Sequence, residues 1–386
     1  MKKILLITTR YPFPILGGDK DRFVGIANAL LKKNEIEIIC ISNKYYKKNY
    51  KNNLSSKIKI LKINFFFRIF YSILFLFRFK PAQLGFYYSN LIKKYIKDVA
   101  INYDVIILHG IRSAQYLPDN FNGRKILEMT DLTSLNFKKI YKAMPFYNPL
   151  KYLYFIDSIL IKKYEDNISQ KFDKIVLISK NDIYEKKKIT FQKKISIIPS
   201  GVILKKKVYK FNLKNYKIIF LGNIKYYPNK IACYNFVNNI FPNLIKNFKN
   251  IEFHIIGKIN FIDKFLLKKN NKIKIHGPVK NIKKLLNGSI CGINNVNIAT
   301  GFQTKILSYM SYGLPTLSFK KKYNEFKDNQ NIIYFENNSE FVKKLFKVKN
   351  NKNFSQKISR NCHYIIKKKY NWDKTLRKYQ KIIIND

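Results

Sequence analysis

Short apolar runs alternate along most of this chain with longer amphipathic stretches, and no other feature of the sequence constrains the fold as strongly. The first repeat is typical. Residues 3–8 are expected to form a buried strand, 12–18 a loop, and 21–33 a helix with one apolar face. Repeated strand-helix pairs of this kind form parallel sheets covered by helices. We therefore predict an α/β fold built on doubly wound parallel sheets.

The repeat is interrupted once, by a polar and basic segment over residues 205–215, which suggests two domains. The chain of 386 residues is also longer than one compact domain, which typically has ~150 residues. We expect Rossmann-like domains over 1–204 and 205–370, and a C-terminal helix over 371–386 that packs back on the first. The expected strands are 3–8, 36–42, 58–63, 105–108, 125–129, 175–178 and 195–198, then 217–221, 251–256, 273–276, 292–296 and 316–319.

The chain is strongly basic, with 75 Lys and Arg against 23 Asp and Glu and a formal net charge of +52. Lys, Asn and Ile recur in strands, helices and loops alike, so compositional drift explains most of the charge, with a membrane-facing contribution left open. No RNA-binding motif and no cluster of Arg with stacking aromatic residues accompanies it. We expect no nucleic-acid partner.

One segment, INFFFRIFYSILFLFRF at residues 63–79, is densely aromatic. Its apolar stretch between Arg68 and Arg78 is far shorter than the ~20 residues of a spanning helix. It fits either a helix in the membrane interface or a buried core helix. The apolar run at 4–7 is also shorter than the ~7 to 15 residues of a signal peptide. We therefore expect a cytoplasmic protein. If residues 63–79 form an interfacial helix, that helix would bind the cytoplasmic face of the inner membrane.

The four cysteines, Cys40, Cys233, Cys291 and Cys362, lie far apart, with neither a CxxC pair nor a histidine at ligand spacing. We expect reduced thiols and no zinc site. Asp19-Lys20-Asp21 has the spacing of a metal-binding DxD motif. Both carboxylates stand where a helix begins, however, and the helix dipole favours them there without a metal. We therefore expect no metal and no cofactor.

Two loops have the features of a phosphate site at the carboxyl ends of parallel strands. In the first domain, Gly17 and Gly18 precede a helix, so its amides favour an anion, although an ordinary glycine turn is the alternative. In the second domain, Gly301 and Phe302 are expected to open a helix whose N-terminal N–H groups bind a diphosphate, with Lys305 one turn further on.

The second loop lies in GFQTKILSYMSYGLPTLSF, which resembles the GxQxKxLEAMAxGxPVV donor segment of family-4 (group 1) GT-B glycosyltransferases, in particular the bacterial exopolysaccharide subgroup. YPFPILGGDKDRF, KPAQLGFYYS, KILEMTDLTSL, FLGNIKYYPN and YNWDKT match in order over nearly the whole length. The resemblance implies GT-B architecture, with two Rossmann-like domains facing a cleft. It also implies metal-independent transfer, with retention, from a nucleotide sugar to a glycan or lipid-linked glycan, in cell-surface exopolysaccharide or lipopolysaccharide biosynthesis.

The resemblance also assigns roles to single residues. It implies a donor diphosphate held by Gly17, Gly18 and the Gly301, Phe302 and Gln303 amides, with Lys305 facing the phosphates. It places His109 near the transferred sugar and Asp131 at a recurrent acidic position, as the catalytic candidates. From the residues alone, His109 also fits a structural strand end, and Asp131 a helix N-cap.

The departures from the family pattern affect the donor site. The two-glutamate motif falls on Thr300 and Ser308, so the carboxylate that usually holds the donor ribose is replaced by a hydroxyl. The basic pair after the first strand of the second domain falls on Asn223 and Pro228, which leaves Lys225, Lys230 or Lys305 as substitutes. The donor-binding candidates therefore include Asn223, Lys225 and Ser308. A catalytically weakened, GT-B-like protein that binds a glycan or partners an active transferase is the alternative function.

Overall fold

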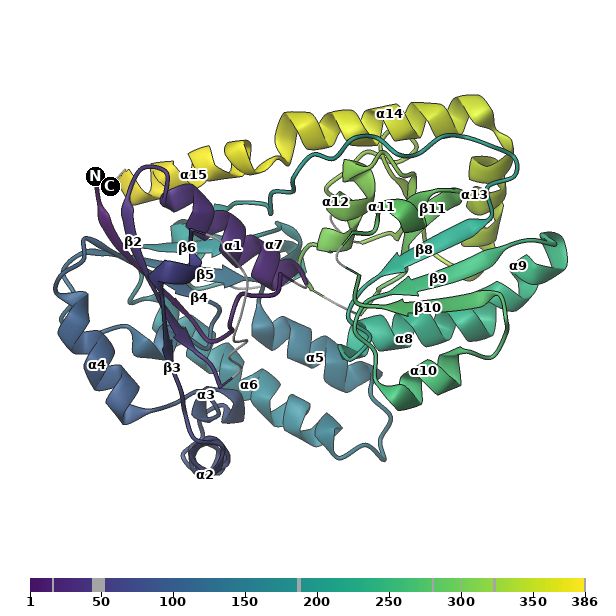
Figure 1. Cartoon of the computed structure of the whole chain (residues 1–386). Helices are drawn as coiled ribbons and strands as arrows, with labels where there is room; N and C mark the ends of the chain where they lie inside the picture. Colours follow the sequence, from purple (N-terminus) through teal and green to yellow (C-terminus); the bar gives the residue numbers. More distant parts are fainter. Residues whose placement is uncertain are drawn as a thin grey trace. The chain divides into compact units, whose positions relative to one another are not determined.

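The computed structural model describes residues 1–15, 17–43, 53–185, 189–279, 281–298, 300–321 and 324–384. The chain divides into two compact units, each built on one parallel sheet (Figure 1). The first unit comprises Met1–Ser200, Thr300–Phe302 and Trp372–Asp386, and the second Gly201–Ala299 and Gln303–Asn371. The predicted α/β class with two doubly wound parallel sheets is confirmed.

The first unit has a seven-stranded sheet in the order β3-β2-β1-β4-β5-β6-β7, and every paired strand runs parallel to its neighbour. All seven strands lie where the apolar runs predict them, with ends shifted by one or two residues. They are β1 Lys3–Thr8, β2 Glu35–Ile41, β3 Ile58–Leu61, β4 Val105–His109, β5 Arg124–Thr130, β6 Lys174–Leu177 and β7 Ile195–Ile197.

Helices cover both faces of this sheet because successive side chains of a strand point to opposite sides. Ile4 and Leu6 of β1 belong to a core formed with α1 and α15, whereas Leu5 and Ile7 belong to one formed with α4. The helices are α1 Gly18–Leu30, α2 Phe65–Phe77, α3 Ala82–Gly85, α4 Asn90–Ala100, α5 Thr133–Ala143, α6 Leu150–Ser169, α7 Asn181–Glu185 and α15 Trp372–Ile384, besides short 3-10 turns.

The C-terminal helix α15 packs on α1 within the first unit. A Cβ atom at Gly25 would lie 2.2 Å from the Trp372 ring, so only glycine admits the indole at this position. Tyr379 and Ile383 of α15 join the same core as Phe23 of α1. The first unit is therefore completed by residues from the far end of the sequence.

The second unit has a six-stranded parallel sheet in the order β10-β9-β8-β11-β12-β13. Its strands are β8 Lys217–Leu221, β9 Glu252–Ile256, β10 Ile273–Gly277, β11 Ser289–Asn294, β12 Thr316–Phe319 and β13 Ile333–Phe335. The sequence did not predict β13, because its three residues are too few for a clear apolar run between polar neighbours. Predicted strand 292–296 begins earlier, at Ser289, and ends at Asn294.

The helices of the second unit are α8 Tyr227–Asn235, a π-helical turn Phe236–Ile240, α9 Phe241–Asn247, α10 Phe261–Leu267, α11 Lys283–Leu286, α12 Thr304–Ser311, α13 Asn338–Asn350 and α14 Lys352–Lys369. Its core combines isoleucine side chains with packed phenylalanine rings, and the Phe236 and Phe253 centroids lie 4.2 Å apart. Across the described part of the chain, no helix is both long enough and apolar enough to cross a bilayer.

Candidate functional site

In the first unit, polar side chains gather where β1, β4 and β5 end. The helix α1 begins at Gly18, three residues before the predicted start, with Gly17 as its N-cap residue. Gly17 adopts φ 105°, a left-handed conformation that favours glycine. Asp19 and Asp21 then occupy the first helical turn, where the helix dipole stabilises negative charge.

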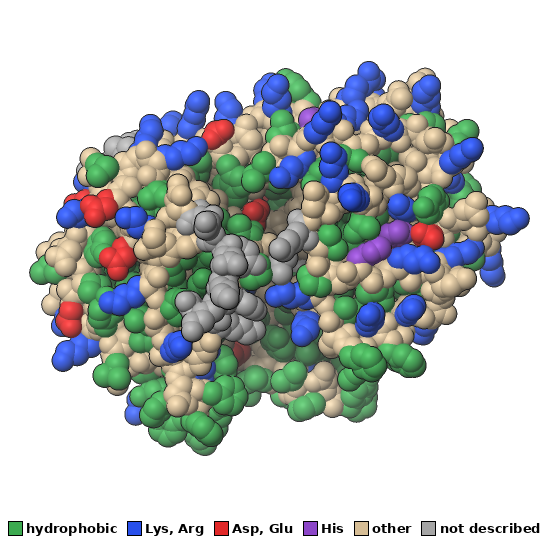
Figure 2. All heavy atoms as spheres, viewed as in Figure 1, with side chains coloured by type: hydrophobic (Ala, Val, Ile, Leu, Met, Phe, Trp, Pro, Cys, Tyr) green, Lys and Arg blue, Asp and Glu red, His purple; other side chains and the backbone are tan. Residues whose placement is uncertain are grey.

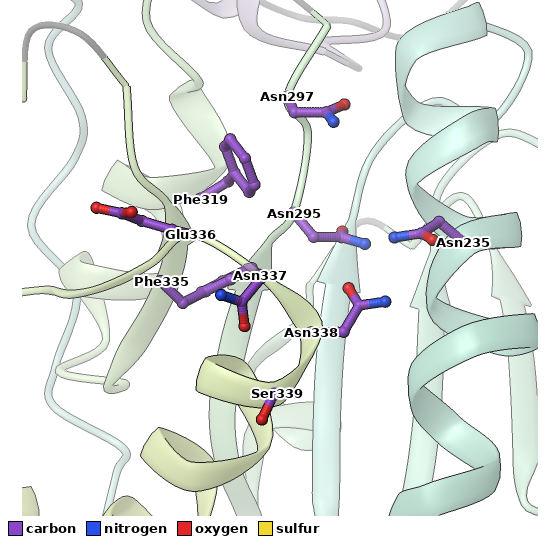
Figure 3. A pocket seen from close by; sticks show the side chains of 9 residues that line it. All are labelled: Asn235, Asn295, Asn297, Phe319, Phe335, Glu336, Asn337, Asn338 and Ser339. Atoms are coloured by element: carbon purple, nitrogen blue, oxygen red, sulfur yellow. The ribbon is translucent and has the colours of Figure 1, made fainter.

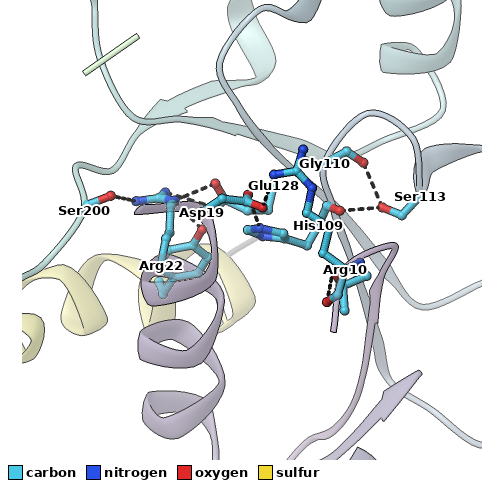
Figure 4. A network of polar contacts seen from close by, with 10 residues as sticks. Arg10, Asp19, Arg22, His109, Gly110, Ser113, Glu128 and Ser200 are labelled. Carbon is cyan, nitrogen blue, oxygen red and sulfur yellow. Dashed lines mark hydrogen bonds and ion pairs between the residues drawn. The ribbon is translucent and has the colours of Figure 1, made fainter. Parts of the chain in front are cut away.

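Asp19 connects the first strand end to the fourth (Figure 4). Its Oδ2 lies 2.8 Å from Nη1 of Arg10, and its Oδ1 lies 3.0 Å from Nε2 of His109. Burial alone would raise the pKa of Asp19, but the charge of Arg10 and the hydrogen bond to His109 hold that pKa well below its ordinary value. The Asp19 carboxylate is therefore ionised and bridges an arginine and a histidine.

His109 is the last residue of β4, one residue beyond the predicted end of that strand, and it is 5% exposed. Its ring stands edge-on to Phe23, with centroids 5.1 Å apart. The Nδ1 atom is buried and has no hydrogen-bond partner. Because Asp19 fixes the opposite nitrogen, Nδ1 of His109 is left with unused hydrogen-bonding capacity.

Asp131 follows β5 directly and lies in the same neighbourhood. Burial first, and then the negative charge of Asp19, raise its pKa to about 6, against the lowering effect of Arg10. The preceding Thr130 has φ 73°, a strained conformation for a β-branched residue. Since α5 begins only at Thr133 with Leu132 as its N-cap, the N-cap interpretation of Asp131 is wrong.

A buried ion pair next to this site links α1 to β5. Nε of Arg22, on α1, lies 2.8 Å from Oε1 of Glu128, on β5, and both side chains are fully buried. The same guanidinium donates to Ser200 at 3.4 Å (Figure 4). It also donates to the Tyr379 hydroxyl at 3.3 Å. Because a buried charge without its partner is costly, this network fixes α1 against β5 and α15.

The loop at Gly301 differs from the prediction. The helix α12 begins at Thr304, with Gln303 as its N-cap, and not at Gly301. Gly301 has φ 65°, and its N–H donates to Oδ1 of Asp182 at 2.8 Å. Thr300 donates to Oδ2 of Asp131 at 3.4 Å. The expected helix-opening role of Gly301 and Phe302 is thus wrong, because a distant carboxylate binds the Gly301 amide.

In the second unit, Lys305 is buried, with 8% of its surface exposed, on the first turn of α12. Its Nζ donates to Oδ1 of Asn229 on α8 at 2.8 Å and lies 4.1 Å from the centroid of the Phe220 ring on β8. Burial lowers the pKa of Lys305 to about 7. This lysine therefore changes its charge near neutral pH and is held by one amide and one ring face.

The other predicted donor residues of the second unit have different environments. Asn223 and Lys225 are exposed in the loop after β8, where the Lys225 N–H donates to Oδ1 of Asn223 at 3.2 Å. Lys230, the other possible substitute, pairs with buried Asp263 at 2.7 Å. The Ser308 hydroxyl donates to the Thr304 carbonyl of its own helix at 3.4 Å. The Asp263 carboxylate therefore competes with a donor phosphate for Lys230 more than any carboxylate does for Lys225 or Lys305.

All four cysteines are buried and free. Among the residues that the structure describes, no group of three or more His, Cys, Asp or Glu side chains is arranged to hold a metal ion.

Residues 215–351, most of which belong to the second unit, match the model of the family described as glycosyl transferases group 1. None of the curated proteins matches the chain by sequence.

Solved structures of similar fold cover nearly all of the chain. A variant of S. aureus TarM, in complex with fondaparinux, alpha-GlcNAc-glycerol and UDP, has a TM-score of 0.69 at 12% identity and covers 100% of both chains. Anabaena HepE in complex with UDP and glucose has a TM-score of 0.70 at 12% identity and also covers 100% of both. Sucrose-phosphate synthase from Thermosynechococcus elongatus reaches 0.72 at 10% identity and covers 99% of this chain and 98% of its own. The fold is GT-B, as the resemblance predicts.

Sequence reasoning missed several residues of these sites. Arg10 follows β1 in TTRYPFP, and Arg112 follows β4, where it donates to Gln83 at 2.7 Å and stacks over Tyr87. An arginine just past a parallel strand is a signal that could have identified both. Asn229 and Phe220, which hold Lys305, carry no comparable signal because their role depends on the packing of α8 against β8.

Proposed function

We propose that this chain is a glycosyltransferase that moves a sugar from a nucleotide-sugar donor onto a glycan or lipid-linked glycan acceptor. The observation that carries the proposal is Lys305, a buried lysine on the first turn of α12 within the group 1 domain. A buried lysine held only by neutral groups favours an anionic ligand, because a phosphate would pair with its charge. HepE and TarM of similar fold were solved with UDP, which supports a uridine nucleotide as the first donor to test.

The proposed reaction proceeds with retention and without a metal. In the second unit, Lys305, Lys225, Asn223 and the first-turn amides of α12 would bind the diphosphate and stabilise the charge that develops as the glycosidic bond breaks. In the first unit, the amides after Gly17 and Gly18 have the same preference for an anion. Electrostatic stabilisation of the leaving group would be the main catalytic contribution.

His109 and Asp131 would act on the sugar and acceptor. With Nε2 bonded to ionised Asp19, the buried Nδ1 of His109 is the ring nitrogen without a hydrogen-bond partner, and we assign it to a hydroxyl of the bound substrate. Asp131, with a pKa of about 6, can hold or release a proton near neutral pH. The product class under this proposal is a cell-surface polysaccharide such as exopolysaccharide or lipopolysaccharide, and this part of the proposal rests on the sequence resemblance.

A binding and turnover screen tests this function. Purified chain would be offered UDP-, GDP- and dTDP-sugars, with thermal shift for binding and nucleotide release for hydrolysis or transfer. A ligand at ~100 times its Kd adds about 2.7 kcal/mol of stability, which a melting curve resolves. A folded protein that neither binds nor cleaves any nucleotide sugar would refute the transferase.

The second candidate, a weakened GT-B protein that binds a glycan or partners a transferase, is favoured by Ser308 and Gly301. Ser308 bonds to its own helix, and the Gly301 amide bonds to Asp182. Two contacts that the family resemblance assigns to the donor are therefore occupied within the chain. Donor binding by the unmodified chain would exclude this candidate.

We further propose that α2 places the protein on the cytoplasmic face of the inner membrane, with anionic lipid as the partner. Its outer surface carries Phe66 and Phe77, which are 81% and 79% exposed, whereas Arg68 is buried. Arg68 donates to the Ile63 carbonyl at 3.2 Å and stacks over Phe86. Hydrophobic side chains gather at the lower left of the molecular surface, where Figure 1 shows α2 (Figure 2).

This reversed polarity favours the interfacial interpretation over a core helix. In a helix that faces water, the arginine would be exposed and the phenylalanines buried. Exposed apolar side chains of this density mark a contact surface, and basic charge attracts anionic lipids. The long helix α6 of the same unit adds exposed Phe155, Ile156 and Ile159.

A further inference from the structure

The second unit contains a pocket of about 470 Å³ that none of the donor-binding candidates lines. It lies where β11, β12 and β13 end and where α13 begins, and α8 contributes one residue. Its lining residues are Asn235, Asn295, Asn297, Phe319, Phe335, Glu336, Asn337, Asn338 and Ser339 (Figure 3).

The lining has an unusual composition for this protein. The chain has 75 Lys and Arg among 386 residues, yet none of the described residues that line the pocket is a Lys or Arg. Its single carboxylate, Glu336, pairs with Lys320 at 2.6 Å. Five asparagines, one serine and two phenylalanines make up the rest. Such a lining does not suit a phosphate or another anion, which would require a cation.

One lining group has an unused hydrogen-bonding atom. Asn295 is 6% exposed, and its Nδ2 donates to the Ala232 carbonyl at 2.7 Å. That bond fixes the orientation of the amide, because a carbonyl accepts only from the NH2 end. Its Oδ1 is buried without a hydrogen-bond partner. Nearly all buried polar atoms are hydrogen-bonded in folded proteins. A ligand with a hydrogen-bond donor would therefore satisfy the Asn295 oxygen.

The neighbouring side chains supply complementary groups. The amides of Asn235, Asn295 and Asn338 converge on one space in Figure 3, with Phe319 beside them. The Phe319 and Phe335 rings meet edge to face, with centroids 5.9 Å apart, and Phe319 is half-buried. Asn338 and Ser339 belong to the first turn of α13, whose N-cap Asn337 accepts from the Glu340 N–H at 2.9 Å.

From these observations we infer that the pocket is a binding subsite for one unit of a neutral saccharide. A sugar offers hydroxyl donors for the Asn295 oxygen, further hydroxyls for the other amides, and an apolar C–H face for the Phe319 ring. The pocket volume is large enough for a ligand of this size. This inference does not depend on the transferase reaction, because the subsite can bind a glycan whether or not the chain transfers a sugar.

The test measures saccharide binding to the full chain by calorimetry and saturation-transfer NMR. The probes are neutral oligosaccharides of glucose, galactose, rhamnose and N-acetylglucosamine, with glucose 6-phosphate as the charged counterpart. We expect at least one neutral probe to bind. The substitutions N338A and N295L should each weaken it about tenfold, as expected for one lost hydrogen bond.

Controls separate the subsite from folding and from the donor site. N350A, at the other end of α13, should leave saccharide affinity unchanged. N338A alters an exposed side chain and should keep the melting temperature of the unmodified chain, so it remains informative if N295L fails to fold. UDP binding should be equal in the unmodified chain and N338A. Absence of binding by every neutral probe, tighter binding of glucose 6-phosphate, or unchanged affinity in N338A would each overturn the inference.

Discussion

Nε2 of His109 lies 3.0 Å from Oδ1 of Asp19, while Oδ2 of the same carboxylate binds Arg10. Because Asp19 is ionised, Nε2 must be the protonated nitrogen, and the proton therefore stays off Nδ1 when the ring is neutral. Asp19 thus sets the tautomer of the histidine that we place near the transferred sugar.

Replacing Asp19 should therefore reduce turnover more than binding. We expect D19N to lower kcat by about 100-fold through loss of the fixed tautomer, with a much smaller change in donor Kd. The measurement is nucleotide release under saturating donor, alongside calorimetry. D98N, which alters an exposed carboxylate on α4, is the matched control. Equal kcat for D19N and D98N would contradict the role of the pair.

Asp131 should make the protein less stable as pH rises. Its pKa is about 6 when folded and near 3.8 when unfolded, so the folded state holds the proton more tightly and stability falls between these values. The substitution D131N removes the cost of ionising this buried carboxyl. It should raise the free energy of unfolding at pH 8 by about 1–2 kcal/mol, a figure that allows for the partial exposure of Asp131. The gain should be smaller at pH 5. Melting temperatures at both pH values test this prediction.

The control for Asp131 is Asp119, whose pKa is lowered by its hydrogen bond and ion pair with Lys171. Its contribution has the opposite sign, because it is present above the unfolded pKa and lost as pH falls. D119N should therefore leave the melting temperature at pH 8 unchanged or slightly lower. A stabilising effect of the same size in both variants would show that the gain has nothing to do with burial of Asp131.

Lys305 should make donor binding pH-dependent. With a pKa of about 7 in the free chain, it is mostly neutral at pH 8.5 and must take up a proton to pair with a diphosphate. UDP affinity should therefore fall between pH 6 and 8.5, and the calorimetric enthalpy should vary with the buffer. K305M should abolish both effects, whereas K246M, at an exposed lysine of α9, should preserve them. A flat pH profile in the unmodified chain would rule out a phosphate contact.

Ser308 offers a gain-of-function test. S308E restores a carboxylate that could accept two charge-assisted hydrogen bonds from a ribose, worth ~1 to 3 kcal/mol. We expect UDP to bind S308E about tenfold more tightly than the unmodified chain, and S308A to bind it equally well. If UDP binds only to S308E, the weakened-protein candidate is correct and the transferase proposal fails.

The exposed face of α2 should determine membrane binding. Phe75 is buried, so a test of the interface must leave it intact and change outward residues. The variant F66S, F70S and F77S removes three exposed rings and should release the protein from anionic liposomes in a flotation assay. L91S with I101S, which removes similarly exposed residues elsewhere, is the control. Unchanged flotation of the triple variant would argue against an interfacial α2.

The sequence predicted most of the fold because its strands are contiguous apolar runs, and such runs are a local signal. The strand β13 was missed because three residues do not form a run. The start of α12 was misplaced because the Gly301 amide bonds to Asp182, which lies far upstream. The environment of Lys305 was equally hidden, since Asn229 and Phe220 meet it only after the sheet and α8 have packed. Local patterns thus predicted elements, whereas contacts between distant residues decided the site.

The packing of Trp372 against Gly25 also sets the timing of folding during synthesis. All seven strands of the first unit have been made by Ser200, but Tyr379 and Ile383 of its core follow about 180 residues later. At roughly 5–20 residues per second, the ribosome needs on the order of ten seconds or more to deliver them. During that interval α1 has no indole beside it, so the core of the first unit cannot be completed before the last residues of the chain are made.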